Sequence, residues 1–183
     1  MYKRQDFNIE AAEYWNSPMI DKRKDLNFIR ELKMRTNDYG IENTFMLVDL
    51  INYQTGESKS LCSNDKIERG IAIEEHKQWI EFSKSIGCKG IRVNLWSDKM
   101  TASEVKSISE DSLGELLEFS NKIDMSIMIE NHGGYTSDAK WLINLIKSID
   151  HPKLGTLPDF GTRNFCIKTA PKSESEIFGS KCC

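Results

Sequence analysis

Two short apolar runs, at residues 125–129 and 154–158, each lead directly into an acidic residue, and this pattern strongly constrains the fold. Glu130 closes the first run, and Asp159 closes the second 29 residues later (159 − 130). A parallel strand–helix–strand unit takes about 30 residues, and a helix-like stretch fills the gap between the two runs. Both carboxylates are therefore expected at the same carboxyl-terminal edge of two adjacent parallel strands.

Apolar runs and amphipathic segments alternate along most of the chain. The apolar runs predict strands at 9–15, 44–50, 90–96, 125–130 and 154–158. The intervening segments predict helices at 21–39, 65–86 and 103–123, and a further one that begins at the capping cluster 136–138 and ends before His151-Pro152. The clearest helical face carries Ala72, His76, Trp79, Ser83 and Ile86. This alternation predicts an α/β protein with a parallel sheet, and the nearly continuous apolar strands favour a barrel.

The number of predicted strands is too small for a closed barrel. A complete eight-stranded β/α barrel typically needs about 250 residues, whereas this chain has 183 residues and five predicted strands. We therefore expect a partial barrel domain over residues 1–165, cut on both sides. Residues 166–183 are polar and are expected to form a tail in place of the loop after the last strand.

Composition and charge exclude several classes of protein. The formal net charge of −3 argues against a non-specific nucleic-acid binder, which normally carries a basic face. No apolar run approaches the roughly 18 residues that would indicate a membrane span, and the first residues do not resemble a secretory signal. The five cysteines lack a CxxC pair and are interpreted as free thiols in a reducing compartment. A cytoplasmic protein is expected.

Three segments carry a family resemblance. IENHGG at 129–134, LPDFG at 157–161 and GCKGIRVN at 87–94 resemble the xylose isomerase-like TIM-barrel superfamily, which contains sugar and sugar phosphate isomerases, epimerases and family-2 AP endonucleases. The resemblance implies that the five strands correspond to strands two to six of the barrel. After LPDFG the sequence departs from the family pattern, because Thr162 and Arg163 precede Asn164-Phe165.

The resemblance also implies a metal site. Family members hold one divalent metal through a Glu on strand five, an Asp on strand six, a His on strand seven and a Glu on strand eight. Glu130 and Asp159 match the first two ligands, and the other two would lie beyond Cys183. Carboxylate and imidazole ligands suit Mn, Mg or Co better than a thiolate site would, so these metals are expected rather than Zn.

The implied activity is a metal-dependent isomerase or epimerase that moves a proton next to a sugar carbonyl, with Glu130 as acid or base. An inosose-type dehydratase uses the same barrel and remains an alternative. A zinc phosphodiesterase of the AP endonuclease type would need more histidine ligands and a basic surface that faces DNA. It is disfavoured because the chain has only three histidines and a net charge of −3. A catalytically incomplete fragment is the non-enzymatic alternative. A small sugar or sugar phosphate is the expected partner, and a homo-oligomer is compatible with the family.

Several other polar residues are candidates for contacts with substrate. His132 fits either a substrate or metal-supporting role or a structural one. Arg92 and Asn94 share one side of their strand, and Arg92 would suit a phosphate or carboxylate, although a buried structural pair fits almost as well. Glu13 and Trp15 end the first strand in the same way, and Trp15 fits either a sugar ring or the core. The remaining polar candidates have weaker support: Asp49 is a weaker site residue, and His76 and His151 are interpreted as structural.

Overall fold

The computed structural model describes residues 9–52, 54–97 and 100–160. Five parallel strands form one sheet in the order of the sequence. The strands are β1 (Ala11–Trp15), β2 (Glu42–Leu47), β3 (Gly90–Val93), β4 (Ser126–Ile129) and β5 (Leu154–Thr156). The helical elements are η1 (Ser17–Lys22), α2 (Leu26–Asp38), α3 (Lys66–Ser85), α4 (Ala102–Lys122), η2 (Gly134–Ser137) and α5 (Ala139–Ile149). The predicted parallel α/β architecture is confirmed. The expected tail, 166–183, lies outside the described residues.

Helix starts follow capping side chains. The Asp138 carboxylate accepts hydrogen bonds from the backbone N–H groups of Lys140 and Trp141, at 2.9 and 3.3 Å, and so begins α5 where the sequence predicts. The predicted helix at 21–39 is wrong in its first turn. Asp25 caps α2 by accepting from the N–H groups of two following residues, so the α-helix begins at Leu26 and residues before it belong to the separate 3₁₀ turn η1.

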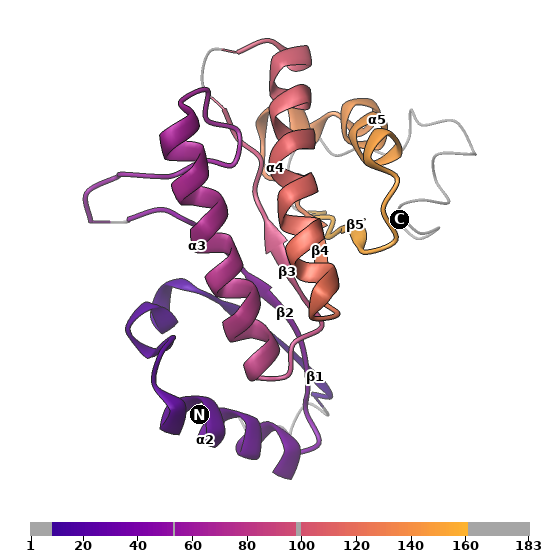
Figure 1. The fold of residues 1–183 in the computed structure, drawn as a ribbon. Helices are drawn as coiled ribbons and strands as arrows, with labels where there is room; N and C mark the ends of the chain where they lie inside the picture. The colour runs from indigo at the N-terminus through magenta and orange to yellow at the C-terminus, as the bar shows by residue number, and fades with distance from the viewer. Residues whose placement is uncertain (1–8, 53, 98–99, 161–183) are drawn as a thin grey trace.

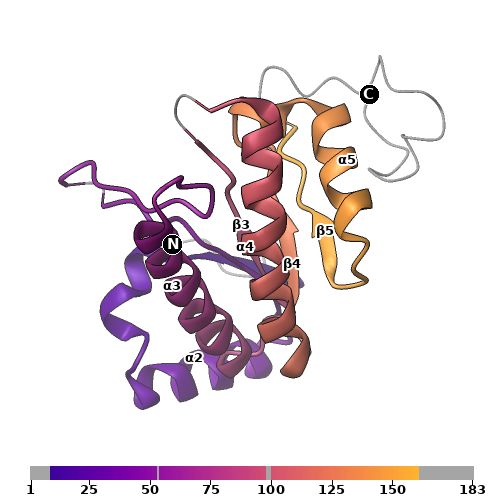
Figure 2. The same cartoon turned by 45° about the horizontal axis from the view of Figure 1, so that its top comes forward.

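The helices cover one face of the sheet. Figures 1 and 2 show α2, α3, α4 and α5 on the same side of the strands, as expected when every strand–helix–strand crossover is right-handed and the strand order is sequential. The strands turn alternate side chains toward these helices, and Ile91, Val93, Ile127 and Ile129 are completely buried there. The opposite face holds the polar residues described below.

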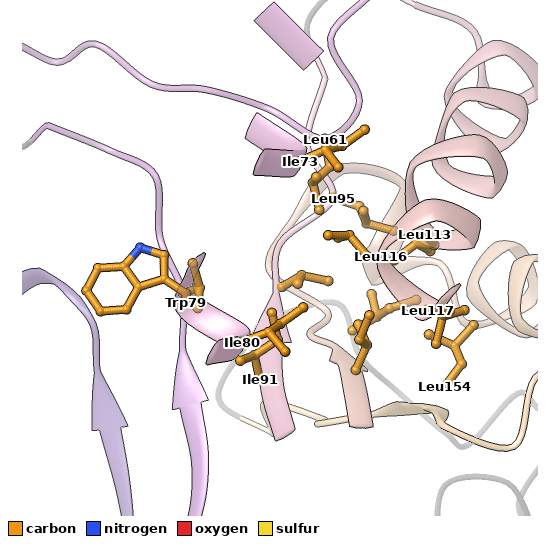
Figure 3. Close-up of a cluster of buried hydrophobic side chains, with 14 of the residues drawn as sticks. Leu61, Ile73, Trp79, Ile80, Ile91, Leu95, Leu113, Leu116, Leu117 and Leu154 are labelled. Carbon is orange, nitrogen blue, oxygen red and sulfur yellow. The ribbon is translucent and has the colours of Figure 1, made fainter. Parts of the chain in front are cut away.

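The hydrophobic core lies between the sheet and the two longest helices. Figure 3 shows buried side chains of α3 and α4 beside those of the strands. The predicted buried face of α3 is confirmed, since Ala72, His76, Trp79 and Ser83 are at most 3% exposed. Within the described residues, no helix combines the length and apolar character that a membrane crossing requires.

Gly90 permits close approach of two strands, and its replacement gives a testable effect. A Cβ atom there would collide with the backbone carbonyl oxygen of Ser126 on β4 and lie 2.8 Å from Cε1 of Phe45. The backbone atom cannot move without disturbing the sheet. We therefore expect Gly90→Ala to lower the free energy of unfolding by about 1–3 kcal/mol, as measured by urea denaturation.

Gly114 provides the matched control for this substitution. It lies within α4, and a Cβ atom there would meet nothing within 4 Å. Glycine in a helix costs roughly 0.5–1 kcal/mol relative to alanine, so Gly114→Ala should raise the free energy of unfolding by about that amount. Equal effects of the two substitutions would contradict the close approach at Gly90.

Candidate functional site

Arg92 lies between two carboxylates at the carboxyl-terminal edge of the sheet. Its Nη1 atom is 2.6 Å from Oδ1 of Asp49, and its Nε atom is 2.8 Å from Oε2 of Glu130. The Arg92 side chain is only 6% exposed, and the two carboxylate side chains are 12% and 14% exposed. The Nε–H group does not point along the line to Oε2, so this second contact is an ion pair without a well-formed hydrogen bond.

Strand register explains why one arginine contacts both acids. Arg92 lies beside Leu47 of β2 and Met128 of β4. Asp49 and Glu130 each lie two residues further along the neighbouring chain segment, and positions two apart in an extended segment face the same side. The long arginine side chain therefore reaches a carboxylate on each flank.

Asp49 is the centre of a hydrogen-bonded group. Its Oδ2 accepts from the indole N–H of Trp15 at 2.8 Å, and its Oδ1 accepts from the Nδ2 group of Asn94 at 2.7 Å in addition to Arg92. We call Trp15, Asp49, Arg92, Asn94 and Glu130 the Asp49 cluster. The cluster joins β1, β3, the segment after β2 and the residue after β4.

The charge state of Asp49 follows from these contacts. Burial alone would raise its pKa, but the hydrogen bond and positive charge of Arg92, together with the Trp15 N–H, hold the pKa of Asp49 below its ordinary value. The carboxylate is therefore ionised at neutral pH. An ionised Asp49 keeps the guanidinium of Arg92 in place beside Glu130.

Glu130 directs its second oxygen toward a histidine. Oε1 lies 3.6 Å from Nδ1 of His132, whose side chain is 61% exposed. The backbone N–H of Glu130 donates to the carbonyl of Val93 at 3.3 Å and so fixes the residue beside β3. Glu130 is thus held by a buried cation on one side and faces a solvent-accessible imidazole on the other.

Asp159 lies at the same edge of the sheet, as the sequence predicts. Its backbone N–H donates to Oδ1 of Asn131 at 2.6 Å, and its carbonyl accepts from Nδ2 of Asn131 at 2.9 Å. Asn131 is almost completely buried. This two-point contact fixes the backbone of Asp159 beside the residue that follows Glu130.

The structure brings most of the predicted site residues together. Trp15, Arg92, Asn94 and Glu130 belong to one cluster, with His132 at its edge. Glu13 is exposed on β1, and within the described residues no hydrogen bond or ion pair joins it to the Asp49 cluster. The guanidinium of Arg92 is already engaged by two carboxylates and by the carbonyl of Val48 at 3.2 Å.

Sequence reasoning undervalued two residues near the site. Asp49 follows an apolar run just as Glu130 does, and that shared position was the available signal. His76 is 3% exposed, which agrees with its structural interpretation, but it also lines a cavity of about 360 Å³ together with Asp49, Asn94 and His132. The cavity opens between the carboxyl-terminal ends of β2 and β3 and the loop before α3.

The residues present fit a hard divalent cation in type but supply only part of a ligand set. Glu130 and Asp159 offer carboxylate oxygens, which Mn²⁺ and Mg²⁺ prefer. Within the described residues, no three His, Cys, Asp or Glu side chains are grouped so that they could hold one metal ion. Other ligands would have to come from outside this group.

Solved structures share the fold. An alignment with the xylose isomerase domain protein from Planctomyces limnophilus has a TM-score of 0.61 at 20% identity and covers 85% of this chain and 56% of that one. The alignment with a D-tagatose 3-epimerase-like protein has a TM-score of 0.67 at 20% identity and covers 85% of this chain and 58% of that one. The alignment with the IolI protein with a bound zinc atom has a TM-score of 0.68 at 17% identity and covers 84% of this chain and 54% of that one. At these identities the alignments show the fold alone.

The chain spans less than three fifths of each of these three proteins. No curated protein matches the sequence significantly. The profile of the family described as xylose isomerase-like TIM barrel matches residues 5–181, which is nearly the whole chain, and the five parallel strands with helices on one face agree with part of such a barrel. The chain therefore belongs to the xylose isomerase-like TIM-barrel family.

Proposed function

We propose that the chain carries half of the active site of a divalent-metal-dependent sugar isomerase or epimerase. The observation that supports this most directly is the Glu130 carboxylate, which is nearly buried at the end of β4 and is held by Arg92 on one oxygen and faced by His132 on the other. Family membership and the neighbouring structures, which include a D-tagatose 3-epimerase-like protein and D-psicose 3-epimerase, support the same class of reaction.

In this proposal Glu130 exchanges a proton with the substrate carbon next to the carbonyl, and it also contributes an oxygen to the metal. Asp159 would provide the second carboxylate ligand. The bound cation, Mn, Mg or Co in preference to Zn, would supply positive charge to the substrate oxygen as negative charge develops there. His132 would donate a hydrogen bond to a substrate oxygen or to Glu130, and the contacts of Arg92 with Asp49 and Glu130 would keep Glu130 oriented.

Titration with Mn²⁺ tests the proposal on the 183-residue chain. We expect saturable binding in calorimetry, and Glu130→Gln should weaken it at least about tenfold, since changes even outside the ligand shell commonly cost 10- to 100-fold. Glu118→Gln is the matched control, because Glu118 is an exposed glutamate on α4 that pairs with Lys122, and it should leave binding unchanged.

Proton exchange provides the second measurement. Incubation of a ketose with the Mn²⁺-loaded chain in D₂O should introduce deuterium next to the carbonyl, detectable by NMR, and Glu130→Gln should abolish it. Equal Mn²⁺ affinity of the parent and of Glu130→Gln would contradict the ligand role of Glu130. Exchange that survives this substitution would contradict its proton-transfer role.

A further inference from the structure

The cavity beside the Asp49 cluster contains a buried histidine with one nitrogen uncommitted. His76 lies on α3 and lines the cavity while being only 3% exposed. Its Nδ1 atom is 2.8 Å from the backbone carbonyl oxygen of Ala72. A carbonyl can only accept, so Nδ1 carries the proton and donates it. Within the described residues, no hydrogen bond uses the other ring nitrogen, Nε2.

The state of the ring follows from this contact and from burial. Burial lowers the pKa of His76 to about 4, although the Ala72 carbonyl and Glu75 act in the opposite direction. The imidazole is therefore neutral at physiological pH, with its single proton on Nδ1. Nε2 then has a free lone pair, and it is a hydrogen-bond acceptor on the edge of the ring turned away from the Ala72 carbonyl.

The rest of the cavity wall has the character of a sugar site. Leu50, Leu95 and the partly buried Trp96 provide apolar surface, while Ser58 and Asn94 provide polar groups. Small-molecule sites are typically apolar clefts of roughly 300–1,000 Å³ with a few placed polar groups, and this cavity measures about 360 Å³. The aromatic face of a tryptophan suits the C–H face of a sugar ring.

The charges at the cavity disfavour an anionic ligand. Lys59 forms an ion pair with Glu75, and Asp49 pairs with Arg92. The only other ionisable groups in the described wall are the imidazoles of His76 and His132. A phosphate group would need unpaired cations or several N–H donors, whereas Nε2 of His76 and the carboxylate of Asp49 require hydrogen donors from the ligand.

We propose that this cavity binds the uncharged, hydroxyl-bearing end of a monosaccharide, and that Nε2 of His76 accepts a hydrogen bond from one of its hydroxyl groups. This inference rests on the proposed function for the identity of the ligand as a sugar. It selects an unphosphorylated sugar over a sugar phosphate. It also places a recognition residue on helix α3, outside the strand ends that carry Glu130 and Asp159.

Binding of D-fructose and of D-fructose 6-phosphate to the 183-residue chain tests the proposal, with saturation-transfer NMR as the measurement. We expect saturable binding of D-fructose and weaker binding of its phosphate. His76→Phe keeps a ring but removes Nε2, and it should weaken D-fructose binding about five- to tenfold, the value of one neutral hydrogen bond. His76→Gln can place an amide oxygen near the same point and should retain more affinity than His76→Phe.

Two further variants separate a local effect from a loss of folding. His151→Phe is the matched control and should leave binding unchanged. His151 lies shortly before β5, at the amino-terminal end of the parallel strands, whereas the cavity lies at their carboxyl-terminal end. Ser58→Phe fills the cavity from the loop before α3 without altering the helix, and it should abolish binding, a larger effect than that of His76→Phe. Far-ultraviolet circular dichroism would verify that each variant is folded.

The outcomes distinguish this inference from the proposed function. Unchanged affinity in both His76→Phe and Ser58→Phe, tighter binding of the phosphate, or no saturable binding of either sugar would overturn the inference. Sugar binding and deuterium exchange that depend on Glu130 but not on His76 would overturn it while leaving the proposed function intact. Binding that depends on His76, with no Mn²⁺ affinity and no exchange, would support the cavity and reject the isomerase activity.

Discussion

Replacing Arg92 with methionine is expected to lower the free energy of unfolding by about 3–5 kcal/mol, because removing one partner of a buried ion pair leaves an uncompensated buried charge. Here the substitution would leave two, since Asp49 and Glu130 are 12% and 14% exposed and both face the guanidinium. Methionine preserves most of the side-chain volume, so the change reports mainly on charge. Urea denaturation followed by circular dichroism gives the measurement.

Lys77→Met is the matched control for this prediction. Lys77 also contacts two carboxylates, those of Glu74 and Glu115, each at 2.6 Å, but these are 64% and 51% exposed. Pairs with exposed partners contribute about 0–1 kcal/mol, so Lys77→Met should change stability by no more than that. If Arg92→Met costs no more than Lys77→Met, then the buried ion pairs do not stabilise this edge of the sheet.

A compensated variant tests the cause. In the triple substitution Asp49→Asn, Arg92→Met and Glu130→Gln, no buried charge remains without a partner. We expect this protein to be more stable than Arg92→Met alone, because replacement of a whole buried ionic group by neutral residues is often close to neutral. A triple variant less stable than the single one would show that lost packing and hydrogen bonds, not stranded charges, dominate.

The sequence predicted the strands well because each one is a short apolar run followed by a polar residue. It also predicted that Glu130 and Asp159 would lie at one edge of the sheet, since both follow parallel strands. Boundaries were less accurate: the strand predicted at 44–50 runs from Glu42 to Leu47, although the backbone N–H of Val48 still donates to the carbonyl of Arg92 on β3 at 3.0 Å.

The partners of Arg92 could not be predicted, because they depend on register between strands that are far apart in the sequence. Nothing local to GIRVN shows that Leu47 and Met128 will flank Arg92 and place Asp49 and Glu130 beside its guanidinium. The local sequence around an arginine does not show whether its side chain will face a substrate or bind carboxylates of its own chain. For the same reason Asp49 had only weak support as a site residue until the fold placed it between Trp15, Arg92 and Asn94.

Acid should destabilise the protein strongly through His76. The unfolded chain binds a proton there near the ordinary pKa of 6.5, whereas in the folded protein burial lowers the pKa to about 4. Between these values the unfolded state binds more protons than the folded state, so stability decreases as the pH falls through this window. The loss reaches about 3 kcal/mol at pH 4, and it levels off below that because the folded ring then binds the proton as well.

The parent and His76→Gln should therefore differ in pH dependence, since glutamine does not titrate. Between pH 7 and pH 4 the unfolding free energy of the parent should fall by about 3 kcal/mol relative to that of His76→Gln. Urea denaturation of both proteins at half-unit steps of pH gives the measurement. Asp49 is present in both proteins, so its own titration cancels in the difference. Its folded pKa lies below the ordinary value of 3.8, and most of its stabilising contribution is therefore lost below pH 4. Parallel stability curves for the two proteins between pH 7 and pH 4 would contradict this prediction. They would mean that His76 takes up its proton at about the same pH in the folded and the unfolded protein, and that the wall of the cavity is open to water.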